Sequence, residues 1–278
     1  MRVCRLAAAL VFLLGGCASG PAPSHDGASA SRGAFPSRGG DAMGALGPTP
    51  SATPGSRCLT APERAGVVRF RSDNGASLAG VLLGVVPGRA GVVLAHSNNT
   101  DLCDWVPYAR VLAGLGYVAL SIDLNGYGAS QASAGVPVDP RYDEDLSAAV
   151  RLLRGRGVGA VFLMGEVIGG TAAVKAATAI TPPVAGVVDV SSPADTLRMD
   201  AVAAARVLRV PLLCIASDID EFVADVRRIA EAAAGAPEHQ LLIVADTTSG
   251  ETNLFDPAIE PKAVEVRAAV ESFLRRHA

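Results

Sequence analysis

Short apolar runs alternate with amphipathic stretches from Cys58 to the end of the chain. The apolar runs are rich in Val, Leu and Ile and do not alternate with polar residues, which is typical of strands buried on both faces. This pattern predicts an α/β fold, a doubly wound, mostly parallel sheet of about eight strands with helices on both faces. We expect strands over residues 67–71, 78–85, 91–95, 117–122, 160–164, 184–190, 211–216 and 240–245. The first two are separated by the turn signal Asp73-Asn74-Gly75 and should form an antiparallel edge hairpin. We expect helices over residues 106–115, 141–154, 168–179, 224–234 and 261–276.

The segment Gly165-Glu166-Val167-Ile168-Gly169 joins the predicted strand 160–164 to the helix that follows it. Its position and its two glycines resemble the nucleophile elbow G-x-S-x-G of the α/β-hydrolase superfamily, with Val167 in the place of the serine. A serine hydroxyl attacks a carbonyl once a base removes its proton, whereas valine has only methyl groups. The chain therefore offers the frame of a hydrolase without its nucleophile.

Further segments resemble the same superfamily, in the order that it implies. They are the strand 92–97 that ends in His96-Ser97, the first-helix segments 104–109 and 112–117, the D-x-x-G-x-G-x-S turn of 121–130 and the Val-Pro-Leu-Leu of 210–213. With the elbow, the resemblance covers nearly everything after Cys58 and implies the α/β-hydrolase fold. Only about twenty residues separate Val190 from Pro211, too few for a large cap domain. Compact members of this kind resemble dienelactone hydrolases, which cleave small esters or lactones.

The resemblance also implies an acid and a base after the nucleophile. Asp220 follows the strand 211–216 and is the candidate for the acid, with Asp218 as the alternative. The base should be a histidine shortly after the last strand, but Ser249 stands in that place. Two departures at the two positions that handle protons indicate that Ser-His-Asp catalysis has been lost.

Other parts of the implied active site survive the change of side chains. Gly165, Gly169 and Gly170 keep the glycines that a sharp turn from strand to helix requires. The oxyanion hole would use the backbone N–H groups of Asn98 and Ile168, which do not depend on the side chain. The polarisation of a bound carbonyl therefore remains chemically available.

An unconventional active site stays open as an alternative. Candidate nucleophiles at predicted strand ends are Ser97, Ser191 and Ser192. None of them has an identifiable nearby histidine except Ser97, which adjoins His96, and the resemblance implies that this histidine supports a loop. The remaining histidines fit surface or tether positions better than an active site: His25, His239 and His277.

The N-terminus resembles a bacterial lipoprotein signal. Residues 1–16 combine early arginines with a short apolar run, which is typical of a removable signal peptide. Leu14-Gly15-Gly16-Cys17 resembles the lipobox, which implies cleavage before Cys17 and acylation of its sulfur. Secretion with a chance cysteine is the alternative. Residues 17–57 are rich in Gly, Ala, Ser and Pro and predict a flexible tether, followed by a folded domain over residues 58–278.

Cysteine usage and charge limit the remaining possibilities. Cys58 and Cys103 could form a disulfide in an oxidising compartment, the alternative being two unpaired thiols, while Cys214 lies in an apolar run and fits a buried thiol. The net charge of −3 is spread evenly, without a basic patch, so nucleic-acid binding has no support. We expect neither a cofactor nor a metal.

These observations favour an exported, membrane-tethered pseudo-hydrolase that binds a small ligand or an envelope protein. The first alternative is an active ester or lactone hydrolase with a displaced nucleophile or base. The second is a purely structural envelope lipoprotein.

Overall fold

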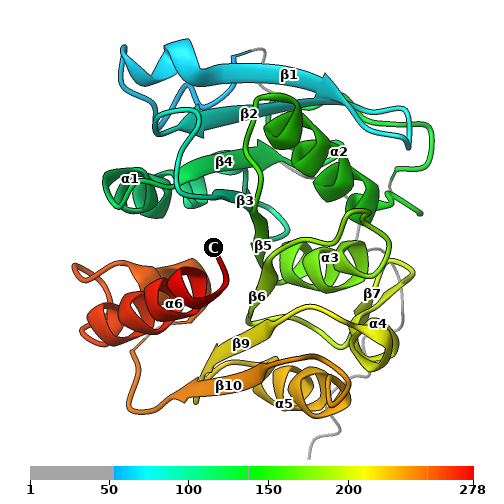
Figure 1. Ribbon diagram of the computed structural model, residues 1–278, viewed down its shortest axis with the longest axis vertical. Coiled ribbons are helices and arrows are strands. Elements are labelled where there is room, and N and C mark those ends of the chain that lie inside the picture. The colour runs from blue at the N-terminus through cyan, green and yellow to red at the C-terminus, as the bar shows by residue number, and fades with distance from the viewer. Residues whose placement is uncertain (1–52, 137, 249) are drawn as a thin grey trace, which may run out of the picture. The chain divides into compact units, whose positions relative to one another are not determined.

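The computed structural model describes residues 53–136, 138–248 and 250–278 (Figure 1). The predicted signal peptide, Cys17 and Ser249 lie outside the described residues, as does nearly all of the predicted tether. Within the described part, no helix is long and apolar enough to cross a membrane.

The predicted sheet is present and has eight strands in the order β1-β2-β4-β3-β5-β6-β9-β10. The pairs β1–β2 and β2–β4 are antiparallel, and every other neighbouring pair is parallel. The edge hairpin that Asp73-Asn74-Gly75 predicts is therefore confirmed. The strands are β1 (Val67–Arg71), β2 (Ser77–Leu83), β3 (Gly91–Ala95), β4 (Val118–Asp123), β5 (Val161–Glu166), β6 (Gly186–Val190), β9 (Leu212–Ser217) and β10 (His239–Val244).

Helices cover both faces of the sheet, as Figure 1 shows. The side chain of Val93 on β3 points into the cluster of buried residues formed with α2, α3, α4 and α5. Its neighbours Val92 and Leu94 point into the opposite cluster, with α1 and α6. This is why the strands read as unbroken apolar runs. The helices are α1 (Val106–Gly114), α2 (Tyr142–Gly155), α3 (Ile168–Ala177), α4 (Ala201–Val207), α5 (Val223–Ala232) and α6 (Ala263–His277), with three short 3-10 helices, η1 (Glu63–Gly66), η2 (Leu102–Asp104) and η3 (Glu251–Phe255).

The segment between β6 and β9 holds no large cap. It contains the two-residue strands β7 (Asp195–Thr196) and β8 (Met199–Asp200), followed by α4. None of these three elements is predicted from the sequence, because each is too short to show a period. The start of α4 does have a sequence signal, because Asp is a preferred N-cap residue. The Asp200 side chain accepts a hydrogen bond from the Ala203 N–H and caps the helix.

The described chain begins beside the first helix layer. Cys58 and Cys103 form a disulfide, which confirms that pairing. The guanidinium of Arg57 lies 2.6 Å from a carboxylate oxygen of Asp101, and Arg110 on α1 donates to the Cys58 carbonyl. The segment around Cys58 is thereby fixed to the loop between β3 and α1.

Candidate functional site

The turn between β5 and α3 has the strained backbone of an elbow. Val167 has φ 49° and ψ −115°, a positive φ that a β-branched residue rarely adopts. Its N–H donates to the Val190 carbonyl at 3.0 Å, and its side chain is buried, with 4% exposed. The elbow conformation is therefore kept at a position that carries no hydroxyl.

The three glycines of this turn are sterically required. A Cβ on Gly165 would overlap the backbone of Gly169, and a Cβ on Gly169 would overlap the Ala95 carbonyl at the end of β3. A Cβ on Gly170 would overlap the Ser192 hydroxyl and would lie 2.6 Å from a carboxylate oxygen of Asp189. The close approach of α3 to β3 and β6 accordingly depends on glycine.

The predicted oxyanion positions lie on neighbouring loops at the carboxyl ends of the parallel strands. Ile168 is the first residue of α3, where the helix dipole places partial positive charge. Asn98 follows β3, the strand that pairs with β5. Neither N–H donates a hydrogen bond to any described residue. The described fold therefore uses neither N–H group as a donor.

The two candidate acids after β9 have different environments. The Asp218 carboxylate accepts hydrogen bonds from the Asp246 N–H at 3.0 Å and the Thr247 hydroxyl at 2.9 Å, and these bonds lower its pKa. One carboxylate oxygen of Asp220 accepts from the Phe222 N–H at 2.7 Å. The other would lie 3.1 Å from a Cβ on Gly250, the residue after Ser249. Asp220 thus faces the segment that should carry the base, and Asp218 fastens the loop after β10.

His96 is committed to the loop after β3. Its side chain is fully buried, with Nδ1 2.6 Å from the Ser97 carbonyl and Nε2 accepting from the Leu124 N–H at 3.0 Å. This pattern places the proton on Nδ1, and burial lowers the pKa to about 4. Both ring nitrogens are occupied, so His96 cannot take a proton from the Ser97 hydroxyl without breaking the loop.

The other described histidines also serve elsewhere. His239 begins β10 and is exposed, and His277 at the end of α6 lies 3.1 Å from a Glu238 carboxylate oxygen. In the part of the chain that the structure describes, no histidine therefore lies in the Asp220 loop or the elbow.

The turn after β4, which carries the D-x-x-G-x-G-x-S pattern, has a structural role. The buried Asp123 carboxylate accepts from the N–H groups of Leu102 and Ala129, each at 2.8 Å. The Ser130 hydroxyl donates to the Asp123 carbonyl and accepts from the Ala79 N–H. Gly128 has φ 51°, and a Cβ there would overlap the Asp123 carboxylate. The pattern therefore supports the loops beside the site rather than the chemistry.

Several serines at the strand ends near the elbow are buried. Ser191, directly after β6, has φ 50°, and its hydroxyl has no hydrogen-bond partner among the described residues. The same is true of the Ser217 hydroxyl at the end of β9. The Ser192 hydroxyl donates to the Val190 carbonyl at 3.3 Å, and the Ser97 hydroxyl donates to the Asn98 side chain at 3.0 Å. Of these four serines, Ser191 and Ser217 are thus the ones whose hydroxyls have no structural assignment.

Glu166, the residue before Val167, is a part of the site that the sequence analysis missed. It is fully buried, and one carboxyl oxygen accepts from the Thr252 N–H at 2.8 Å. Burial raises its pKa well above the usual range, and the nearby carboxyls of Asp104 and Glu251 raise it further. The signal in the sequence is a charged residue two positions after the apolar run 160–164. These surroundings favour the protonated form of the carboxyl.

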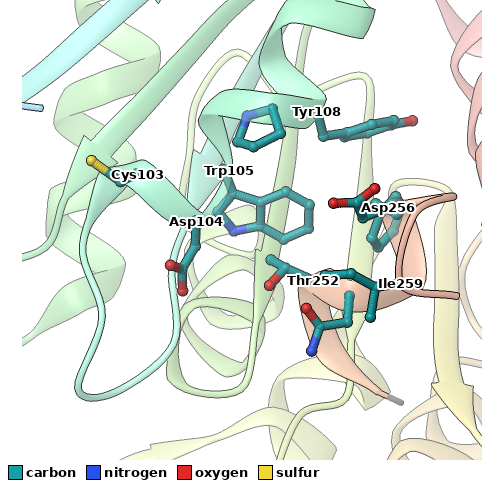
Figure 2. A pocket seen from close by; sticks show the side chains of 10 residues that line it. Cys103, Asp104, Trp105, Tyr108, Thr252, Asp256 and Ile259 are labelled. Atoms are coloured by element: carbon teal, nitrogen blue, oxygen red, sulfur yellow. The ribbon is translucent and has the colours of Figure 1, made fainter. Parts of the chain in front are cut away.

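A pocket of about 220 Å³ lies where η2 and α1 meet η3 (Figure 2). Its lining includes the carboxyls of Asp104 and Asp256, together with Thr252. The aromatic side chains of Trp105, Tyr108 and Phe255 form part of the wall, and the rings of Trp105 and Phe255 have centroids 5.3 Å apart. The pocket therefore combines acidic groups with an apolar wall.

Comparison with known proteins supports the architecture. Residues 87–211 match the family model described as serine aminopeptidase S33, a group of α/β-hydrolases. No curated protein sequence matches the chain. An esterase of Pyrococcus furiosus superposes with a TM-score of 0.68 at 16% identity, covering 82% of this chain and 97% of the esterase.

Two further solved structures share the fold. A thermophilic esterase of Thermogutta terrifontis superposes with a TM-score of 0.60 at 17% identity, over 76% of this chain and 99% of the esterase. An enol-lactonase of Burkholderia xenovorans superposes with a TM-score of 0.57 at 19% identity, over 74% of this chain and 99% of the lactonase. The fold of the chain is thereby that of compact α/β-hydrolases without a large cap.

Proposed function

We propose that the chain, which has the α/β-hydrolase fold, is a pseudo-hydrolase of that superfamily, which binds a small carbonyl compound without cleaving it. The observation that carries the proposal is the elbow itself. Val167 holds the strained conformation of a nucleophile, φ 49° and ψ −115°, with a side chain that cannot attack. Strain of this kind costs about 1–3 kcal/mol. A turn that is kept at this cost is consistent with a role in positioning the N–H groups that bind a ligand.

The groups that remain suit binding. The N–H groups of Ile168 and Asn98 donate to no described residue and lie on adjoining loops. In an active hydrolase, two such N–H donors stabilise the oxyanion of the intermediate. The same two donors could bind the carbonyl oxygen of a ligand. Loss of triad members costs on the order of a millionfold in rate, so these donors alone support binding far better than turnover.

Two measurements on the purified protein test this proposal. Turnover of short-chain p-nitrophenyl esters should not exceed background, and a serine-directed fluorophosphonate should not label the protein. The matched gain-of-function variant is Val167→Ser with Ser249→His, which should hydrolyse the ester weakly, while neither single change does. Stoichiometric labelling of the unchanged protein, or turnover at rates typical of a triad, would contradict the proposal.

An active hydrolase with a displaced nucleophile is the second candidate. It is favoured by Ser191, whose buried hydroxyl lacks a partner among the described residues and whose φ of 50° is strained. If this serine is the nucleophile, the fluorophosphonate labels Ser191 and the variant Ser191→Ala abolishes labelling. A purely structural body, the third candidate, predicts that no carbonyl compound raises the melting temperature.

We also propose that the protein is exported and anchored to a bacterial membrane by acylated Cys17. The lipobox-like Leu14-Gly15-Gly16-Cys17 supports the anchor, and the Cys58–Cys103 disulfide suits an oxidising compartment. Metabolic labelling with palmitate should mark the protein, and Cys17→Ala should release it from the membrane fraction. Unlabelled protein in that fraction, or an envelope partner that retains the Cys17→Ala variant, would contradict lipid anchoring.

A further inference from the structure

The strand β10 forms one edge of the sheet, and one side of its backbone has no neighbouring strand. It is last in the strand order and pairs only with β9. The carbonyls of Glu238 and Val244 accept hydrogen bonds from the β9 side. Because backbone groups point alternately to the two sides of a strand, the N–H and C=O groups of His239, Leu241 and Ile243 point away from β9. No other strand of the described chain pairs with this side.

The side chains of β10 do not protect this edge. Its sequence, His-Gln-Leu-Leu-Ile-Val, contains no Lys, Arg, Asp, Glu or Pro, and Leu241 in its middle is 39% exposed. The opposite edge of the sheet, β1, instead carries Arg69 and Arg71, both exposed. Proteins usually guard a free edge with charged residues or proline, because an apolar edge pairs readily with another strand. Figure 1 shows β10 at the end of the sheet that lacks this protection.

The free side of β10 is complementary to itself. Its outward-pointing backbone groups belong to three residues at a spacing of two. An antiparallel pair with a twofold axis through Leu241 therefore places Leu241 opposite itself and His239 opposite Ile243. All three positions then exchange backbone hydrogen bonds, about six in total. The same register packs the exposed Leu241 side chains of the two copies against each other and removes them from water.

The charges near the two ends of β10 favour the same antiparallel arrangement. Asp246 lies just after the strand, and the Arg209 guanidinium lies against Gly235, just before it, where a Cβ would be 2.8 Å away. Neither charge forms an ion pair among the described residues. Antiparallel pairing brings the end of one strand beside the start of the other, and so Asp246 of each copy towards Arg209 of the other. Glu238, the acid that precedes β10, is already paired with Arg276 at 2.7 Å.

We infer that β10 is the interface of a twofold dimer, in which two copies of this chain pair antiparallel along β10 and form one continuous sheet. A second copy suits this edge because the same strand, reversed, supplies both the apolar centre and the opposite charges at the ends. Pairing uses the unguarded edge of each copy and leaves the arginine-bearing β1 outside, so assembly stops at two. The dimer is independent of the proposed function, because the elbow follows β5 in the middle of the sheet.

The mass of the purified protein in solution tests this interface. The Cys17→Ala variant, which cannot be acylated at that position, is used throughout. At tens of micromolar, analytical ultracentrifugation should give twice the mass of the chain. Leu241→Arg should weaken dimerisation about tenfold or more, because it sets two like charges opposite each other on the axis. Val85→Arg is the matched control, since Val85 is 81% exposed and follows β2, at the other end of the sheet, and it should leave the dimer unchanged.

Two further sets of variants locate the contact and do not depend on how Leu241→Arg folds, which melting curves report. A short bismaleimide should join two copies of Leu241→Cys and leave Val85→Cys unjoined. Asp246→Arg and Arg209→Asp should each weaken the dimer about fivefold, and the two together should restore it. A monomer at this concentration, assemblies larger than two, or equal cross-linking of the two cysteine variants would overturn the interface. So would a dimer that Leu241→Arg and Val85→Arg affect equally.

Discussion

The turn after β4 and the elbow after β5 follow strands that both pair with β3. The two turns differ in whether their side chains form hydrogen bonds. In the β4 turn, the Asp123 and Ser130 side chains bond to the backbone of neighbouring loops. In the elbow, the side chain at the central position serves no such bond, because Val167 has no polar atom. The polar side chains of the β4 turn thus support the fold, whereas the central position of the elbow carries an apolar side chain. The glycines at both turns are steric requirements of the fold itself.

The largest effect should come from filling the elbow. In Gly169→Ala the new methyl group would overlap the Ala95 carbonyl and lie 2.7 Å from the His96 carbonyl oxygen. Because both obstacles are backbone atoms, we expect the free energy of unfolding in urea to fall by about 3 kcal/mol. The control is Gly155→Ala at the end of α2, where a Cβ meets nothing within 4 Å and stability should not fall. Equal stability of the two variants would mean that α3 is not tightly seated on β3.

The β4 turn should respond next. Ser130→Ala removes the acceptor of the buried Ala79 N–H, a bond of 2.8 Å, and the donor to the Asp123 carbonyl. An unsatisfied buried N–H costs about 2 kcal/mol, which chemical denaturation would detect. Thr178→Ala is the control, since this exposed hydroxyl bonds only the Lys175 carbonyl and its loss should change stability by less than about 0.5 kcal/mol. If Ser130→Ala is as stable as this control, the polar side chains of the β4 turn do not stabilise the fold.

A buried carboxyl beside the elbow should make stability depend on pH. Burial raises the pKa of Asp189 from 3.8 to about 6, so the folded state holds its proton over a range where the unfolded state releases it. This group therefore stabilises the fold fully below the unfolded pKa, and that contribution is lost as pH rises through 6. Relative to Asp189→Asn, the unchanged protein should lose about 2 kcal/mol of stability between pH 4 and pH 7, since each unit of pKa shift corresponds to about 1.4 kcal/mol.

Differential urea unfolding across that pH range measures the effect. Subtracting the stability of the Asp189→Asn variant from that of the unchanged protein cancels the titration of distant groups such as Glu63, whose pKa is lowered to about 2 by Arg110. A difference that is flat with pH would show that Asp189 has the same affinity for protons in both states.

The sequence was sufficient for the parallel core and insufficient for the acidic pocket. Strands such as β3, Gly91–Ala95, are buried on both faces, so their composition alone identifies them. The position after β9 predicts Asp220 or Asp218 as the acid, and the structure adds only that Asp220 lies beside Gly250 whereas Asp218 bonds the Asp246 N–H. Asp104, Thr252 and Asp256 are far apart in the chain, and nothing local in the sequence indicates that they line one pocket. Such charge clusters arise from tertiary packing, which no periodic pattern records.

The smallest effect should come from the elbow's own central residue. Val167→Ser exchanges two buried methyl groups for a buried hydroxyl, which costs about 1.6 kcal/mol of apolar burial in addition to the burial of the hydroxyl, but it also relieves a β-branched side chain held at φ 49°. The relief offsets most of this cost, so we expect the free energy of unfolding to fall by only about 1 kcal/mol. Val174→Ser is the control, because Val174 is also buried, in ordinary helical conformation on α3, and its loss should cost about 3 kcal/mol. Urea denaturation measures the free energy of unfolding of both variants. If it falls equally in the two, the backbone at Val167 is not strained. The strain that supports a binding role for the elbow would then be absent.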